Sequence, residues 1–588
     1  MKFRTILAAL CVTLSPLVSC VKIDNSLGSN FIPSDQIWNV FPCEAVSLNE
    51  ITMEKSDSLS GYSTSRFTFG SVKDDNFTSD KSTSFTLVPL QNSIDFGKDT
   101  KVLQFHFTAV RDTLSTLYDN QEKMLQNVYV HPLKQPLDST VLYTGTFSNS
   151  LMLDKFIDLS KTVTAGIPVY DGGDSLSFDF SEEYAWEVIN GIKEWQAIEG
   201  ARRDSISSYL EKVPGIYFRT ASQTEKGGRI NMFDLPLETS DGYIDGNYAE
   251  LKIRAKYNDS QDWTDTLFVF YFGPSEFIKE GATSYPAQYA FNASSNTSRE
   301  GFMEEWESGA KDKLHIEGGS GYKPVVKARE IKNIVEALVE EKAKIHGFNK
   351  NEVVINKATI VLPYNVGTEY DRLDRYPMIL SPTVKLVSDN KKYISYAGLT
   401  DSSIESENQG DINLSRCMYC PDVSHHVQEI MKLTQGEGEK VDPNETAEQF
   451  EERLERYDIW FLIMHEEVTS SGTTDSAYDD YYNNLLYNSY YQNMMYDPYG
   501  YGYGGYGYGY GGYGYGGYGG YGDYGYNNYY NYYMMAAYAN ASNSSSSATS
   551  SIELDKDRFY DAVINGPGAT SDKPSIKITF SAPNRSEE

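Results

Sequence analysis

The sequence predicts a mainly β protein made of two jelly-roll-like β-sandwich halves with a few short helices. Three observations support this fold class. Short apolar segments alternate with polar residues at a period of two, turns rich in Gly, Asn and Asp separate them, and amphipathic helical patterns are few. In the segment 101–110, for example, Leu103, Phe105 and Phe107 alternate with polar neighbours, which is typical of a sheet with one solvent-facing side.

The N-terminus has the features of a bacterial lipoprotein signal. Lys2 and Arg4 precede an apolar stretch over 6–18, and the sequence Leu17-Val18-Ser19-Cys20 resembles a lipobox. We expect cleavage after residue 19 and acylation of Cys20, which then holds the protein on a membrane through its acyl chains. The alternative is a plain secretory signal with an incidental cysteine. Residues 20–45 are predicted to be the lipid-anchored tether, ending in a first edge strand.

The first half, residues 46–280, is predicted to be an N-terminal β-sandwich with one helix. Ser181 is a favourable N-cap residue, two glutamates follow it, and apolar residues from Tyr184 to Trp195 recur at helical spacing. The segments expected to form strands are 63–71, 84–90, 101–110, 128–133, 215–220, 250–257 and 266–272.

The second half, residues 281–475 together with 551–588, is predicted to be a C-terminal β-sandwich. Ile331, Ile334, Val335 and Leu338 follow the spacing of an amphipathic helix over 328–345. A short helix is expected after Ser424, as its N-cap. The expected strands are 353–362, 383–387, 392–396, 458–465 and 575–581.

Two pairs of short segments indicate that the halves arose by duplication. Asp179-Phe180-Ser181 and Asp422-Val423-Ser424 each precede an expected helix, and Leu251-Lys252-Ile253 resembles Ile576-Lys577-Ile578. We therefore expect two similar sandwiches, each with a small helix against a sheet.

Residues 476–550 are predicted to be a disordered insert rich in Tyr, Gly and Ser. Glycine at this density costs much backbone entropy, and no periodic apolar face compensates for it. One interpretation is a low-complexity expansion in a tolerant loop. The other is an adhesive patch for glycans or partner proteins, because tyrosine rings stack on flat partners; its candidate residues are Tyr499, Tyr501, Tyr503, Tyr506, Tyr508 and Tyr510.

Charge and hydropathy exclude two classes of protein. The chain has 588 residues, with 82 Asp and Glu against 51 Lys and Arg, which gives a formal charge of −31. This balance is unfavourable for a nucleic-acid partner, since it repels phosphates. A mean hydropathy of −0.47 excludes a protein with many membrane spans.

One cluster contains residue types that bind metals. Cys417 and Cys420 have the spacing with which two thiolates hold Zn²⁺, and His425 and His426 follow closely. The second cysteine pair of a zinc ribbon is absent, and the histidines occupy what we expect to be exposed helix positions. We therefore expect no metal site here, and either a disulfide or two ordinary thiols.

Several segments resemble the Bacteroidota lipoprotein family known as domain of unknown function 4270. The similarity begins after the anchor, at residues 26–33, and its most specific segment is 355–362. The other similar segments are 69–71, 94–97, 209–218, 561–563 and 576–580. The resemblance implies an exported, membrane-anchored, mostly β protein and supplies no catalytic residue.

These observations predict a lipid-anchored cell-envelope protein of the outer membrane with a non-catalytic binding or structural role. We expect no cofactor and no catalytic residue, since G-x-S-x-G and P-loop motifs are absent and the closely spaced glycines of 500–520 lack the preceding strand and following helix of a dinucleotide site. Whether the anchored body faces the periplasm or the cell surface stays open. Three alternatives also stay open: a glycan-binding surface module, an accessory lipoprotein of an outer-membrane complex, and a carboxylate-based hydrolase.

Overall fold

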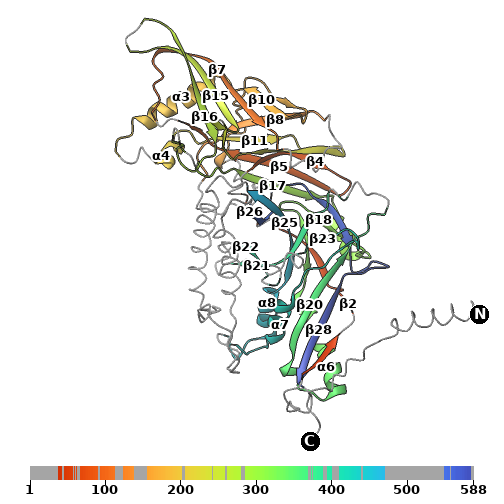
Figure 1. The fold of residues 1–588 in the computed structure, drawn as a ribbon. Helices are drawn as coiled ribbons and strands as arrows, with labels where there is room; N and C mark the ends of the chain where they lie inside the picture. The colour runs from red at the N-terminus through yellow and green to blue at the C-terminus, as the bar shows by residue number, and fades with distance from the viewer. Residues whose placement is uncertain are drawn as a thin grey trace, which may run out of the picture.

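Antiparallel sheets dominate the structure, and 45% of the described residues are in strands and 19% are helical. The predicted mainly β fold class is therefore confirmed. Figure 1 shows the N-terminal half above the C-terminal half, with β17 between them. The computed structural model describes residues 38–583 except 43–44, 57–58, 60, 62–65, 91–92, 113–123, 138–154, 201–204, 241–242, 259–260, 280–281, 283–284, 368–372, 374, 388–393, 400, 402–409, 439–440, 470–548 and 557.

The N-terminal half consists of two facing antiparallel sheets. The first has the strand order β10 (Ser175–Asp179), β7 (Lys98–Val110), β15 (Tyr248–Lys256), β16 (Thr264–Phe272) and β6 (Leu87–Pro89). The second has the order β12 (Gly227–Asp234), β4 (Arg66–Lys73), β5 (Phe77–Phe85), β11 (Ile216–Thr220), β8 (Gln126–Pro132) and β9 (Val169–Tyr170), with β17 (Phe291–Ser298) also paired to β5. A small hairpin joins β13 (Glu238–Ser240) to β14 (Tyr243–Asp245).

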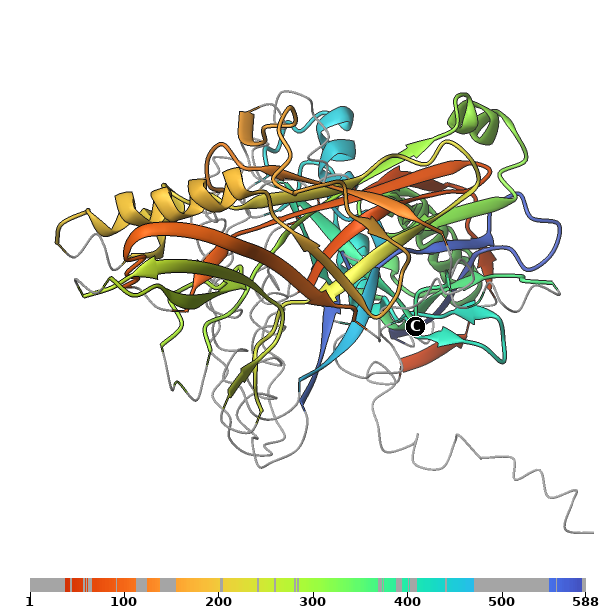
Figure 2. The same cartoon turned by 90° about the horizontal axis from the view of Figure 1, so that it is seen from above.

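Stacked phenylalanines fill the space between these two sheets. Phe67 and Phe233 stack with ring centroids 4.8 Å apart, and Phe107 stacks on Phe272 at the same distance. Such pairs add about 0.5–1.5 kcal/mol each to the stabilisation from burial. Helix α3 (Glu182–Gln196) lies along this half, as Figure 2 shows, and α4 (Ile206–Leu210) follows it. The predicted N-cap of α3 is confirmed, because the Ser181 hydroxyl accepts the Tyr184 N–H at 3.1 Å.

The C-terminal half also contains two large sheets. One has the order β1 (Trp38–Pro42), β28 (Ser575–Pro583), β20 (Val354–Pro363), β24 (Met418–Tyr419) and β23 (Ile412–Asn413), with β2 (Val46–Ser47) on β28. The other has the order β22 (Ile394–Gly398), β21 (Ile379–Val387), β25 (Ile459–Thr469), β19 (Tyr322–Val326) and β3 (Ile51–Lys55), with β26 (Thr549–Leu554) on β25. Strands β18 (Lys313–Glu317) and β27 (Asp561–Asn565) form a separate two-stranded ribbon.

Helices cover the core of this half. They are α5 (Phe302–Ser308), α6 (Ala328–His346), the short 3₁₀ helix η7 (Lys350–Glu352), α7 (Ser424–Lys432) and α8 (Ala447–Glu455). The buried side of α6 carries Ile331, Val335 and Val339, as its predicted period indicates. Gly347, in the left-handed region at φ 73°, ends this helix.

The boundaries of the two halves differ from the predicted ones. Strands β1, β2 and β3 pair with β28 and β19, so residues 38–55 belong to the C-terminal half. Strand β17 pairs with β5 over eight residues, from Phe291↔Ser84 to Ser298↔Phe77, so it belongs to the N-terminal half although it follows residue 281. Partners this distant in sequence leave no local signal of their pairing, and local periodicity therefore placed these strands with their neighbours in the chain.

A β-bulge in β7 makes one core prediction wrong. Phe105 and Phe107 are buried as expected, but Leu103 is 43% exposed. In the register with β15, Lys252 pairs with Gln104 and Ile253 pairs with Val102, so Leu103 is the extra residue. A bulge shifts the alternation by one residue, which turns Leu103 to the solvent face and Val102 toward the core.

The start of α7 also differs from the prediction, which gave Ser424 the role of the N-cap. Ser424 is the first helical residue, and its hydroxyl accepts the Ala358 N–H at 2.8 Å instead. The carboxylate of Asp401 accepts the N–H groups of His425 and His426 at 2.7 and 3.1 Å. Asp401, which lies outside α7, therefore accepts the free N–H groups at the N-terminus of this helix. Ser424 resembles Ser181 in its local sequence but does not cap its helix as Ser181 does.

Buried polar contacts join the two halves. Lys81, on β5, donates to the carbonyl oxygens of Lys556 and Arg558, both at 3.2 Å. Ser320 donates to the carbonyl oxygen of Ser294, on β17, at 2.7 Å. Both donors are at most 3% exposed, so loss of either contact would leave buried polar groups unsatisfied.

The predicted insert and the predicted anchor lie outside the residues that the structure describes. The signal peptide 1–19 and Cys20 precede residue 38, and residues 470–548 include all six candidate tyrosines from Tyr499 to Tyr510. Strands β25 and β26, which flank 470–548, pair with each other from Met464↔Leu554 to Thr469↔Thr549. Within the part of the chain that the structure describes, no helix combines the length and the apolar character that crossing a bilayer requires.

Candidate functional site

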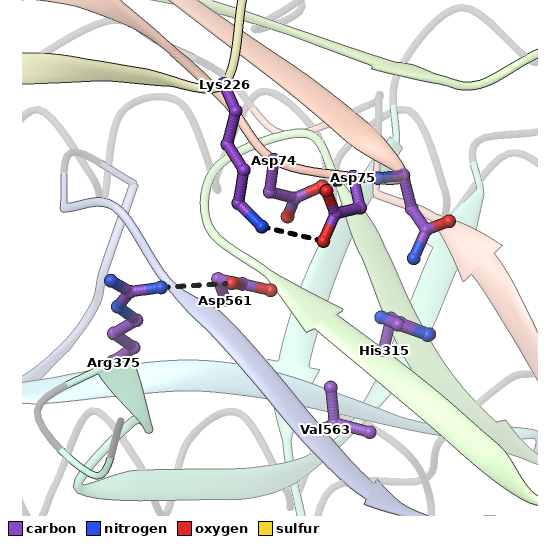
Figure 3. Close-up of a pocket in the computed structure, with 8 residues that line it drawn as sticks. Asp74, Asp75, Lys226, His315, Arg375, Asp561 and Val563 are labelled. Carbon is purple, nitrogen blue, oxygen red and sulfur yellow. Dashed lines mark hydrogen bonds and ion pairs between the residues drawn. The ribbon is translucent and has the colours of Figure 1, made fainter. Parts of the chain in front are cut away.

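A polar pocket of about 390 Å³ lies at the junction of the two halves. Its volume is within the range of small-molecule sites, which occur preferentially between domains. Figure 3 shows side chains from both halves converging on it. The lining residues are Asp74, Asp75 and Asn76 between β4 and β5, Lys226 before β12, His315 on β18, Arg375 between β20 and β21, and Asp561 and Val563 on β27.

The β18–β27 ribbon forms one wall of the pocket. Its register pairs His315 with Val563 and Glu317 with Asp561. Since side chains alternate along a strand, these four residues lie on the same face of the ribbon. The pocket therefore receives His315, Asp561 and Val563 from adjacent positions, while Glu317 lies deeper.

The turn between β4 and β5 forms the opposite wall. Asp74 Oδ1 accepts the N–H groups of Asn76 and Phe77 at 2.7 and 2.6 Å, which fixes the turn. Asp75 then meets Lys226, whose Nζ lies 2.7 Å from Asp75 Oδ2 (Figure 3).

The two ion pairs of the pocket differ, and the Asp75–Lys226 pair is exposed enough to exchange with a ligand. The side chains of Asp75 and Lys226 are 77% and 68% exposed, so water screens their attraction. Arg375 Nη1 lies 3.6 Å from Asp561 Oδ2, beyond normal hydrogen-bond distance. Three carboxylates (Asp74, Asp75 and Asp561) and two cations line the pocket, which leaves one net negative charge apart from His315.

A buried pair of ionisable groups lies behind the ribbon. Burial raises the pKa of Glu317 to about 7 and lowers the pKa of Lys323 to about 7. The Lys323 ammonium donates to the carbonyl oxygens of Glu317, Gly319 and Gly321, the last two at 3.1 and 3.2 Å. Glu317 Oε2 accepts from Asn296 of β17 at 3.2 Å, so the carboxylate also contacts the N-terminal half.

The structure does not bring the predicted metal candidates together. Cys417 is exposed, Cys420 is half-buried, and both are free thiols. His426 is 2% exposed, which corrects its expected exposed position, and its Nε2 lies 2.8 Å from the carbonyl oxygen of Tyr457. Among the residues described, no group of three or more His, Cys, Asp or Glu side chains is arranged to hold a metal ion.

A second polar cluster lies on the solvent-facing side of the N-terminal sheet. Asp179 Oδ1 is 2.7 Å from His106 Nδ1, and Ser177 Oγ is 2.8 Å from His106 Nε2. Gln104 donates to the same Asp179 oxygen at 2.9 Å. Burial raises the pKa of the Asp179 carboxyl, but the hydrogen bonds from His106 and Gln104 outweigh it and the net shift is downward. The order Ser–His–Asp is that of a nucleophilic triad.

Sequence reasoning identified none of the pocket residues as functional. A signal was present at Asp74-Asp75-Asn76, a polar turn next to the predicted strand 63–71, but it is indistinguishable from other turns. The ribbon that supplies His315 and Asp561 joins residues about 250 positions apart, and no local pattern indicates it.

Comparison with known proteins adds no assignment. No family model, no curated protein and no solved structure matches this chain. The resemblance to domain of unknown function 4270 therefore stays a prediction.

Proposed function

We propose that the protein is a lipid-anchored envelope protein of the outer membrane with a non-catalytic binding role, and that its ligand site is the pocket between the two halves. The observation that carries the binding role is the pocket itself, which has charged residues from both halves and one exposed ion pair, Asp75–Lys226. The lipobox-like sequence Leu17-Val18-Ser19-Cys20 supports the anchor.

The chemistry of the lining favours a small hydroxylated ligand with a neutral or positive charge. Carboxylates, one amide and two cations supply both acceptors and donors for hydroxyl groups. The excess of one negative charge favours an amine over a carboxylate on the ligand. Amino sugars and neutral hexoses have these features, which keeps the glycan-binding alternative within the same site.

The binding role predicts a ligand signal that depends on the pocket. In saturation-transfer NMR with glucose, glucosamine and N-acetylglucosamine, we expect a signal for wild type that is lost in Asp75→Ala/Lys226→Ala. The matched control is Arg254→Ala/Asp265→Ala, which removes another exposed ion pair, with Nε–Oδ1 at 2.6 Å, far from the pocket on β15 and β16. No wild-type signal, or equal signals in both double variants, would reject this site.

Metabolic palmitate should label wild type but not Cys20→Ala, and equal labelling would reject the anchor.

A second candidate function is ester hydrolysis by Ser177, His106 and Asp179. In this reaction Ser177 Oγ would attack the ester carbonyl carbon, His106 Nε2 would take the hydroxyl proton and return it to the leaving alkoxide, and water would hydrolyse the acyl-serine by the same route. The cluster ranks second because the His106 and Asp179 side chains are 33% and 47% exposed on an open sheet, where water is not excluded.

A fluorophosphonate probe tests this second function. If Ser177 is an activated nucleophile, the probe should label wild type and Ser175→Ala but not Ser177→Ala. Ser175 is the matched control because it is exposed on the same face of β10, two residues away. An unlabelled wild-type protein, or label that persists in Ser177→Ala, would exclude the triad from catalysis.

A further inference from the structure

Four exposed apolar side chains gather at one end of the C-terminal half. Trp38 and Val40 on β1 are 41% and 60% exposed, and Val354 on β20 is 39% exposed. Ile345, in the last turn of α6, is 64% exposed. We call this set of four residues the basal end.

The strand register places three of these residues at the same level of the sheet. Val40 and Val354 both pair with Ser581, from opposite sides of β28, and Trp38 pairs with Pro583 at the end of the strand. Side chains alternate along β1, so Trp38 and Val40 share the outer face while Phe41 points into the core, where it is 8% exposed.

The end of α6 belongs to the same region. The Phe41 ring contacts the rings of His346 and Phe348 at 5.0 and 5.2 Å, which fixes the C-terminal turn of α6 beside β1. Figure 1 shows α6 next to the lower ends of β20 and β28, away from the N-terminal half. The end of α6 therefore lies against the inner face of β1, at the same end of the C-terminal half as Trp38 and Val40 on the outer face.

Basic side chains flank this apolar surface. Lys350 and Lys357 are exposed on η7 and β20, a few residues from Val354. In a chain with a net charge of −31, these cations next to exposed apolar groups are the arrangement that suits lipid headgroups. The tryptophan ring prefers the same interfacial zone, and lysine stems extend their ammonium groups toward phosphates.

The chain before Trp38 is short. Only residues 21–37 separate Cys20 from the first described strand. Seventeen residues cannot span more than about 60 Å even when fully extended. An acylated Cys20 would therefore hold the basal end close to the bilayer and raise its local concentration there.

We propose that the basal end rests on the bilayer surface, with Trp38 and Val40 inserted at the boundary between the headgroups and the acyl chains and the N-terminal half projecting away from the membrane. This inference rests on the proposed lipid anchor. The partner of this surface is a lipid bilayer rather than a protein. In this orientation the ligand pocket at the junction stays open to the aqueous side.

Brominated lipids test the orientation, because bromine on the acyl chains quenches only tryptophans that reach them. The native acylated protein is reconstituted into phosphatidylcholine vesicles with and without bromine. We expect clear quenching for wild type, loss of most of it in Trp38→Phe, and a marked decrease in Val40→Glu, which retains Trp38 but places a charge on the same face. Trp263→Phe is the matched control, since Trp263 is 44% exposed but lies in the N-terminal half; it should retain the wild-type quenching.

Palmitate labelling of the same preparations separates the two proposals. A labelled wild-type protein whose quenching is unchanged in Trp38→Phe overturns the basal surface and leaves the anchor intact. A wild-type protein without palmitate overturns the anchor, and the basal orientation with it. Equal quenching in Trp263→Phe and wild type, with loss in Trp38→Phe, supports the orientation.

Discussion

Replacement of Lys323 by methionine is expected to lower the free energy of unfolding by about 1–3 kcal/mol, because it leaves buried carbonyl oxygens without their hydrogen-bond donor. Lys323 is 2% exposed and Glu317 is 4% exposed. The carbonyl oxygens that lose their donor are those of Glu317, Gly319 and Gly321. Chemical denaturation at neutral pH measures the loss.

A double variant distinguishes the effect of the Glu317 carboxyl from that of the lost hydrogen bonds. Lys323→Met/Glu317→Gln removes the need to protonate the Glu317 carboxyl, so it should recover only a part of the stability lost in Lys323→Met, while the loss from the carbonyl oxygens remains. Lys313→Met, an exposed lysine on the adjacent strand β18, is the control and should change stability by no more than about 0.5 kcal/mol. A loss in Lys323→Met as small as in Lys313→Met would contradict the prediction.

Substitution of His426 by glutamine should remove part of the acid sensitivity of the protein. Burial lowers the pKa of His426 to about 4 in the folded state, from 6.5. Between these values the unfolded chain binds a proton that the native imidazole does not, so the free energy of unfolding falls as the pH falls. The stabilisation is complete above pH 6.5 and is lost progressively toward pH 4. It amounts to roughly 2 kcal/mol between pH 7 and pH 5.

The measurement compares free energies of unfolding at pH 7 and pH 5. Wild type should lose about 2 kcal/mol more than His426→Gln over this interval. His425→Gln, at the adjacent and more exposed position, should retain the wild-type dependence because His426 is still present. Identical pH profiles for wild type and His426→Gln would show that His426 is accessible to protons in the folded state.

Local periodicity predicted the elements well where one face of a strand or helix is buried along its whole length. The segments 101–110, 250–257 and 575–581 correspond to β7, β15 and β28, and the amphipathic pattern over 328–345 corresponds to α6. The α3 cap was predictable from Ser181 because a cap depends only on residues within one turn. Local patterns failed at Leu103, where a single bulge reverses the alternation.

The candidate site could not be predicted from the sequence because its residues come from distant parts of the chain. The metal candidates Cys417, Cys420, His425 and His426 were selected by proximity in the chain, but the buried His426 ring contacts the carbonyl oxygen of Tyr457 instead. The pocket instead joins Asp74, Lys226 and Asp561, which are 152 and 335 residues apart in the chain.

The sequence by itself determined the mainly β class, because alternation at a period of two depends on each strand alone. It also contains the lipobox-like segment ending at Cys20 and the Tyr- and Gly-rich composition of 476–550. Only the tertiary structure decided that β1–β3 belong to the C-terminal half, that His426 is buried, and that a charged pocket lies at the junction. The physical reason is that strand pairing and burial depend on contacts between distant segments, whose register no local pattern encodes.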